Sequence, residues 1–142
     1  MGKRDKKGNR SKFIMLDHWV FEHSMYRSLC LGARSLLWEL IRKYDGYNNG
    51  RLFLSHRDAA QRLGCSRNTV GGYYKELELA GFILKTRGHC LGPEGKGQST
   101  QWALTHVSAN GCSATMEFKK TKPPHKKRAF LVPIIDPPVC TN

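Results

Sequence analysis

Apolar residues recur at helical spacing in three parts of the chain, and each recurrence predicts an amphipathic helix. These helices are expected over residues 33–44, over the segment that follows Ser55, and over residues 66–80. A shorter helical turn is expected over residues 24–29. The apolar side chains predicted to face inward on the three long helices are Leu36, Leu37, Leu40, Ile41, Tyr44, Ala59, Ala60, Leu63, Val70, Tyr74 and Leu77.

The last two of these helices have clear start and stop signals. Ser55 and Ser66 stand where an N-cap side chain accepts a backbone N–H, and Asp58 completes a variant of the capping box. Gly64 and Gly81 suit the positive φ at which helices often end. A turn of three or four residues between two helices is the helix-turn-helix geometry, whose second helix can enter a DNA major groove.

Short runs with β character predict three strands, over residues 51–54, 82–86 and 101–105. They are expected to form one small antiparallel sheet, in the order helix-strand-helix-helix-strand-strand. Residues 88–99 hold four glycines and one proline, and therefore predict a long loop, or wing, between the last two strands. The predicted fold class is α+β, with a three-helix core and a small winged sheet.

Two further segments are rich in aromatic or turn-forming residues. Residues 13–21 are either a strand or a short segment laid over the core, and Trp19 and Phe21 are expected to pack there. Trp38 lies off the main stripe of its helix, and packs either on residues 13–21 or on a second copy of the protein. The Asn-rich turn at 45–50 is expected to contain positive φ angles.

Two sequence runs carry a resemblance to a known family. They are Ala-Ala-x-x-Leu-Gly-Cys-Ser-Arg-Asn-Thr-Val at 59–70 and Glu-Leu-Glu-x-x-Gly-Phe-Ile at 76–83. They resemble winged helix-turn-helix DNA-binding proteins of bacteria and their phages, such as the GntR and MarR groups. The longer stretch 26–105, about 80 of the 142 residues, resembles small helix-turn-helix proteins of bacterial genomes, phages and mobile elements. Its marks are Tyr-Arg-Ser-Leu, Ala-Arg-x-Leu-Leu-x-Glu-Leu, Tyr-Asp-Gly-Tyr-Asn-Asn-Gly and Trp-x-Leu-Thr.

The resemblance implies that the helix over 66–80 contacts DNA near its amino end. Arg67 can pair with guanine and Asn68 with adenine. The chain departs from the family at Gly71 and Gly72, where members often carry Arg or another polar residue. These glycines either let the helix approach the groove floor closely or mark a helix that reads no bases there. The candidate DNA-contacting residues are Ser55, Arg57, Ser66, Arg67, Asn68, Thr69, Gly72, Tyr73 and Lys75, with Arg87, His89 and Lys96 at the wing.

Some of these candidates have a second interpretation. Tyr73 either bonds to a phosphate or covers the edge of the core, and Lys75 is either a backbone contact or an ordinary exposed lysine. The wing is either a backbone or minor-groove contact or a surface loop with no partner.

The charge of the chain points to a polyanionic partner. It has 24 Lys and Arg against 11 Asp and Glu, a net charge of +13. Residues 1–12 hold six of the cations and residues 119–128 hold six more, so the ends are more basic than the middle. These ends are either merely solvated or add salt-dependent phosphate contacts.

The chain divides into three predicted parts. A disordered basic arm over 1–12 precedes a winged helix-turn-helix domain over 13–107, and a flexible, basic and proline-rich tail follows over 108–142. Within the tail, residues 129–135 are apolar enough to form a short docking segment.

Other classes of function find little support. The chain has no phosphate-binding Gly-x-x-x-x-Gly-Lys-Ser/Thr loop, no His-Glu-x-x-His pair and no paired carboxylates, so an enzyme is not expected. The five cysteines are widely spaced and are expected to be free thiols; only His89 and Cys90 adjoin as potential ligands. No metal, cofactor, small-molecule ligand or membrane partner is expected. With no apolar run of 18 residues and no signal peptide, the expected location is the cytoplasm, on the nucleoid.

The expected function is sequence-specific binding of double-stranded DNA by a transcriptional regulator. A replication initiator or a recombination directionality factor of a plasmid, phage or mobile element is the alternative within DNA binding. A protein–protein adaptor built on a winged-helix scaffold is the alternative from another class. A homodimer is left open, because no heptad or long terminal helix supplies a dimer seam.

Overall fold

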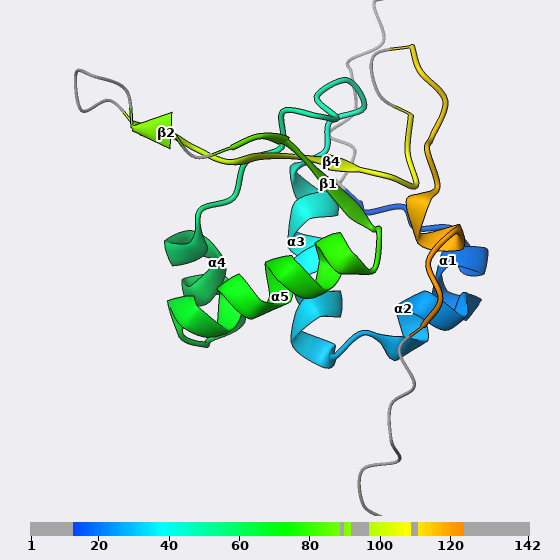
Figure 1. Ribbon diagram of the computed structural model, residues 1–142, viewed down its shortest axis with the longest axis horizontal. Helices are drawn as coiled ribbons and strands as arrows, with labels where there is room; N and C mark the ends of the chain where they lie inside the picture. Colours follow the sequence, from blue (N-terminus) through cyan, green and yellow to red (C-terminus); the bar gives the residue numbers. More distant parts are fainter. Residues whose placement is uncertain (1–12, 89, 92–96, 109–110, 124–142) are drawn as a thin grey trace, which may run out of the picture.

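The computed structural model describes residues 13–88, 90–91, 97–108 and 111–123. The predicted arm over 1–12, the tail from residue 124, and the wing residues His89 and Lys96 lie outside these ranges. The helices are α1 (His18–Glu22), α2 (Ser24–Ser28), α3 (Leu31–Lys43), α4 (His56–Leu63) and α5 (Arg67–Leu79). They are followed by strands β1 (Ile83–Arg87), β2 (Cys90–Leu91), β3 (Gly97–Gln98) and β4 (Gln101–Leu104), and by a 3-10 turn, η1 (Glu117–Lys119). The fold is therefore α+β, with the helices preceding a two-stranded antiparallel sheet of β1 and β4 (Figure 1).

The two capped helices, α4 and α5, form where the sequence predicts them. Ser55 Oγ accepts the N–H of Asp58 at 3.0 Å, and Ser66 Oγ accepts the N–H of Thr69 at 3.2 Å. Gly64 ends α4 with a φ of 64°. Helix α3 begins earlier than residue 33, because the Cys30 thiol accepts the N–H of Ala33 and caps it.

The core lies between the helices and one face of the sheet, and it confirms most of the predicted inward positions. Leu36, Leu37 and Leu40 of α3 are fully buried. Only Tyr44 and Leu63 among the predicted inward residues are half-buried. Burial of these side chains supplies the main stabilising term of the fold. Within the described part of the chain, no helix is long and apolar enough to cross a membrane.

The predicted three-stranded sheet is wrong in its first strand. Instead of a strand over 51–54, Leu52 alone bridges Trp102, with N···O distances of 3.1 and 2.8 Å. The backbone enters the α4 cap at Ser55 directly afterwards, which leaves too short a run for a longer ladder. Strand β4 pairs on its other side with β1, and there Ile83 lies opposite Leu104.

The glycine-rich region between β1 and β4 is not a loop throughout. Strands β2 and β3 pair within it, with Cys90 opposite Gln98 and Leu91 opposite Gly97. The register shifts between Lys85 and Arg87, before this second ladder begins. The sequence prediction followed the glycine content and missed that an antiparallel pair can continue past such an irregularity.

The turn at 45–50 has its positive φ angles at Gly46 and Gly50, whereas its asparagines do not. Asn49 is instead buried at 1 % exposure. Its Oδ1 accepts the N–H of Leu104 at 2.7 Å, and its Nδ2 donates to the carbonyl oxygens of Leu104 and Val107 at 2.9 and 3.1 Å. Asn49 therefore anchors this turn to the end of β4.

Residues 13–21 contain no strand: an irregular stretch leads into α1. Trp38 packs on this segment, with its ring 5.4 Å from that of Phe21, and its indole N–H donates to the Tyr26 hydroxyl at 3.3 Å. The first of the two predicted positions for Trp38 is thus the observed one. Trp19 stacks on Phe118 at 5.8 Å, as expected for a packing residue.

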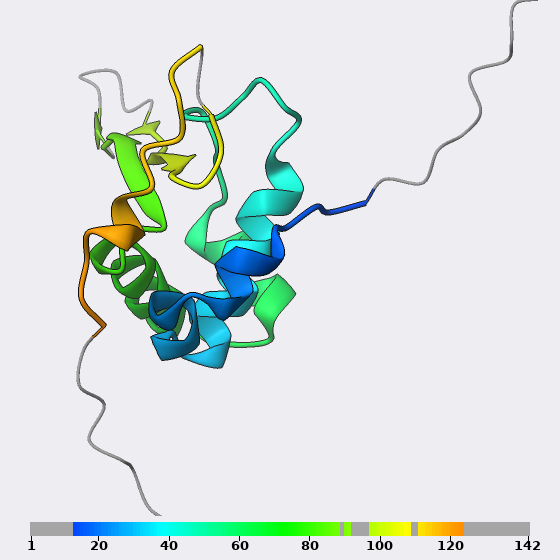
Figure 2. The same cartoon turned by 90° about the vertical axis from the view of Figure 1, so that its right-hand side faces the viewer.

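Phe118 shows that the folded part extends beyond the predicted boundary at residue 107. Its side chain is fully buried, and its ring stacks on Phe82 at 4.6 Å. Residues 111–123 run back along the helices and place η1 near the end of α5 (Figure 2). Gly81 permits this contact, because its φ is 77° and a Cβ there would meet the Phe118 nitrogen at 2.7 Å.

Candidate nucleic-acid interface

The candidate interface is centred on α5, whose buried side is held by a stack of three aromatic rings. Tyr74 of α5 lies between His56, at 5.0 Å, and Trp102 of β4, also at 5.0 Å. The Tyr74 hydroxyl donates to the carbonyl oxygen of Leu54 at 2.8 Å, and burial raises the pKa of this phenol. The stack therefore fixes α5 against the start of α4 and against the sheet.

A second anchor joins α5 to the junction of α2 and α3. The Glu76 carboxylate accepts the backbone N–H of Cys30 at 2.7 Å and its thiol at 3.0 Å. Burial, and then the bond to Glu76, raise the pKa of the Cys30 thiol. Because Glu76 is held at this junction, its charge does not point from the outer face of the helix.

The outer face of α5 carries an exposed stripe, which we define as Asn68, Gly72 and Lys75. All three are exposed, and their spacing of four and three residues places them on one side of the helix. Arg67 and Thr69 are also exposed at the amino end of the helix. Leu79 continues the stripe at 79 % exposure, a position that sequence reasoning missed although its spacing from Lys75 could have revealed it.

The fold does not require glycine at Gly71 or Gly72. A Cβ on Gly72 would meet no described atom within 4 Å, and one on Gly71 would touch His56 at an ordinary 3.7 Å. Neither residue has a positive φ. Glycine in a helix interior costs about 1 kcal/mol relative to alanine. The two residues therefore weaken α5 without any gain in packing. Gly72 is exposed and leaves the outer backbone bare, whereas Gly71 is half-buried beside His56.

The hydroxyl groups near the amino ends are already engaged in capping. Ser66 and Thr69 share a bond between their hydroxyl oxygens at 2.8 Å, and Ser55 caps α4. Arg57 is exposed in the first turn of α4. Of the predicted site residues on the helices, Arg57, Arg67, Asn68 and Lys75 thus present exposed polar side chains with no capping role.

Tyr73 does not share the exposed stripe. Its ring lies against Gly32 of α3, where there is no room for a Cβ. Tyr73 is half-buried and packs against the core cluster. The structure therefore supports the second of its two interpretations, a residue that covers the edge of the core.

The hairpin of β1 and β4 lies above α5 in both views (Figures 1 and 2). Arg87 is exposed at the end of β1, while Lys85 lies over the Trp102 ring at 5.6 Å. The other two predicted wing residues, His89 and Lys96, lie outside the described residues. Arg87 therefore lies exposed on the hairpin, while the other described candidates lie on α4, on α5 and at their caps.

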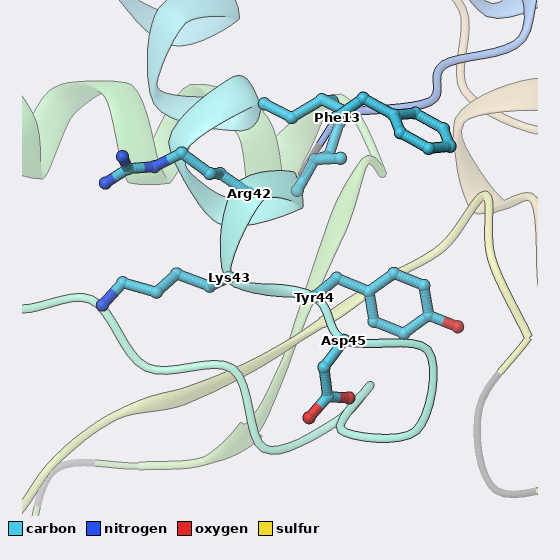
Figure 3. Close-up of a pocket in the computed structure, with 7 residues that line it drawn as sticks. Phe13, Arg42, Lys43, Tyr44 and Asp45 are labelled. Atoms are coloured by element: carbon cyan, nitrogen blue, oxygen red, sulfur yellow. The ribbon is translucent and has the colours of Figure 1, made fainter. Parts of the chain in front are cut away.

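A separate hollow lies at the carboxyl end of α3 (Figure 3). The residues that line it are Phe13, Ile14, Ile41, Arg42, Lys43, Tyr44 and Asp45. The Arg42 and Lys43 side chains extend away from Phe13 (Figure 3). The Asp45 carboxylate accepts the N–H groups of Tyr47 and Asn48, and the Tyr47 bond contributes most to the lowering of its pKa. Among the described residues, the lining does not bring polar side chains together in the way typical of a small-molecule site.

The described residues contain no group of three or more His, Cys, Asp or Glu side chains placed to hold a metal ion. Comparisons with family models, curated proteins and solved structures gave no match to this chain.

Proposed function

We propose that this protein binds double-stranded DNA through a winged helix-turn-helix and acts as a sequence-specific transcriptional regulator. In this proposal α4 and α5 form the helix-turn-helix, and α5 enters the major groove. The hairpin of β1 and β4 is the wing, and it contacts the backbone or the minor groove.

The observation that carries the proposal is the exposed stripe of Asn68, Gly72 and Lys75 on α5, a helix whose opposite side is fixed by packing and hydrogen bonds. A reading helix must keep its orientation while its outer face stays free for base edges. The ring stack at Tyr74 and the Glu76 anchor meet the first requirement. The exposure of the stripe meets the second.

The bare backbone at Gly72 supports a close approach. Without a side chain at this position, α5 can lie deeper in a groove than a helix with a bulky residue there. Arg67 and Asn68 then stand at the amino end, where the helix dipole and free N–H groups favour phosphate. Their side chains match guanine and adenine edges respectively.

The net charge of +13 supports a polyanionic partner over a protein partner. Several of the described acidic side chains are also engaged internally, and Glu39 and Glu76 are examples. Glu39 pairs with Arg42 and Arg62 at 3.2 Å each, and Glu76 is held at Cys30. Glu78 is exposed on α5, but helical spacing places it off the stripe.

The test is a binding measurement on two duplexes with the Arg67→Ala variant. One duplex is selected from a random library with the full chain, and the other is random sequence. We expect Arg67→Ala to lower the affinity for the selected duplex about 10- to 100-fold, the equivalent of about 1–3 kcal/mol. The affinity for the random duplex should fall much less.

Lys43→Ala is the charge-matched control, since Lys43 is exposed at the far end of α3 and lies off α5. This variant should lower the affinity for both duplexes slightly and equally. An equal loss on both duplexes from Arg67→Ala would make this residue a phosphate contact only. No binding by the full chain even at about 50 mM salt would favour the protein adaptor instead.

A further inference from the structure

A groove lies between α2 and the carboxyl half of α5, and we call it the α2–α5 groove. Its volume is about 550 Å³. Met25 and Leu29 give it an apolar wall on the α2 side, and Leu79 and Ala80 give one at the end of α5. The charged residues Lys75, Glu76 and Lys122 also line it. Leu79 is 79 % exposed, whereas Met25, Leu29 and Ala80 are buried, so Leu79 supplies the exposed apolar surface of the groove, beside the exposed stripe.

The chain itself leads into this groove. Thr121 and Lys122 line it, and Thr121 is held there by a bond from its hydroxyl to the Glu117 carbonyl oxygen at 3.3 Å. The described chain ends one residue later, at Pro123. Its last described segment, orange in Figure 1, passes beside α2. Whatever follows Pro123 therefore starts at the mouth of the groove.

The residues that follow contain a single apolar run, Ala-Phe-Leu-Val-Pro-Ile-Ile at 129–135. Residues 123–128 separate this run from Lys122, and six residues span at most about 20 Å. That reach covers the groove, because Thr121 and Lys122 are already part of its lining. A tether of this length holds the run at an effective concentration on the order of millimolar.

We propose that residues 129–135 dock in the α2–α5 groove of the same chain. Pro133 bars a regular helix, so the run docks as a short irregular or extended segment. Its apolar side chains would cover Leu79 and remove the exposed surface of the groove from water. A second copy of the chain or a foreign protein is less favoured as occupant, because neither arrives already tethered at the groove.

The docked segment also regulates DNA binding, and this consequence rests on the function proposed above. Gly72 and Lys75 belong both to the exposed stripe and to the lining of the groove. A segment seated on them would occupy space that a DNA duplex needs. Docking and DNA binding are therefore mutually exclusive, and the carboxyl end of the chain acts as an autoinhibitor.

Docking is tested by the methyl signal of Met25, which lines the groove. The full chain is compared with a chain ending at Arg128, which keeps the whole described core and all six cations of 119–128. With ¹³C-methyl methionine labelling, the Met25 signal should move on truncation while those of Met15 and Met116 should not. Added peptide 129–142 should return the Met25 signal toward its full-chain position in a saturable manner.

The matched variants are Leu79→Ser and Leu31→Ser. Leu79 and Leu31 are 79 % and 77 % exposed, so both variants should fold, but only Leu79 lines the groove. Leu79→Ser in the full chain should reproduce the effect of truncation on Met25, and Leu31→Ser should not. An identical Met25 signal in the full and truncated chains would overturn the docking. A signal that moves with protein concentration would make a second copy the occupant, and would equally overturn docking within one chain.

The DNA measurement separates this inference from the proposed function. A segment docked nine-tenths of the time should weaken DNA binding about tenfold, so the chain ending at Arg128 should bind about tenfold more tightly than the full chain. If Met25 moves and neither chain binds DNA, docking stands and the proposed function falls. If both chains bind DNA equally and Met25 does not move, the function stands and docking falls. If Met25 moves while DNA affinity stays the same, the autoinhibition is overturned.

Discussion

His106 is the most unusual single residue in the described core, because it is buried without a hydrogen bond. It is 9 % exposed, and neither Nδ1 nor Nε2 has a partner among the described residues. Burial lowers its pKa to about 4, although the Asp17 charge opposes this shift. An imidazole in this state is neutral at pH 7 and is costly to protonate in place.

This burial predicts a loss of stability in mild acid. The folded-state pKa is about 4 and the unfolded value is about 6.5, so the unfolded state takes up the proton first. The free energy of unfolding is therefore highest above about pH 6.5. It falls by about 3 kcal/mol in total as the pH drops toward 4. Urea unfolding at several pH values checks this. His106→Leu should flatten the dependence of the free energy of unfolding on pH. If this variant keeps the slope of the unsubstituted protein, other titrating groups cause the loss of stability.

Gly72 supports a second prediction at the level of single residues. Gly72→Ala should raise the free energy of unfolding by up to about 1 kcal/mol, because alanine is the better helix former and its Cβ meets open space. The same methyl group should weaken binding to the selected duplex if α5 lies close to the groove floor. Urea unfolding and DNA titration measure the two effects separately. Unchanged DNA affinity in a stabilised variant would argue against close approach at this position.

Among the elements, the final segment with η1 behaves as part of the domain. It contributes Phe118 to the core, between Phe82 and Trp19. His23 adds an edge-on contact at 5.1 Å. The segment thus links the amino-terminal helices to the start of β1, and both should depend on it for stability.

Removing the Phe118 ring tests this dependence. Phe118→Ala should cost about 3–5 kcal/mol, the usual range for a buried phenylalanine. Lys120→Ala, an exposed change in the same segment, should cost little, since its pair with Glu117 is on the surface. Thermal and urea unfolding of both variants give the comparison. A small cost for Phe118→Ala would mean that the segment adds little to the fold.

Across the molecule as a whole, positive charge is concentrated toward the ends of the chain. Residues 1–12 carry six Lys and Arg against one Asp, and they lie outside the described residues. Deleting this arm should weaken binding to selected and random duplexes alike. It should also flatten the plot of log affinity against log salt, by about 0.9 for each phosphate that the arm neutralises. The plot is measured for the full and shortened chains, and parallel lines would exclude the arm from the interface.

Part of the candidate site could be predicted from sequence because helical spacing alone determines it. With Val70, Tyr74 and Leu77 facing inward, the sequence predicts an outward stripe of Arg67, Asn68, Gly71, Gly72 and Lys75. All of these are exposed except Gly71, which is half-buried and faces His56. The surroundings of Tyr73 and Leu79 were harder to predict, because they depend on which elements pack beside α5. Gly32 of α3 supplies the surface for Tyr73, and α2 supplies the opposite wall at Leu79.

Local sequence was enough to specify α3, α4 and α5 and the caps of the last two, since helix periodicity, Ser55, Ser66 and Gly64 act over a few neighbouring residues. Three other features follow from the packed molecule: the single-residue bridge at Leu52, the burial of Asn49 and the place of Phe118. Each of these depends on partners far away in the chain, as Asn49 does on Leu104. A local pattern holds no information about such partners, because the backbone path that joins them is set by the packing of the whole core.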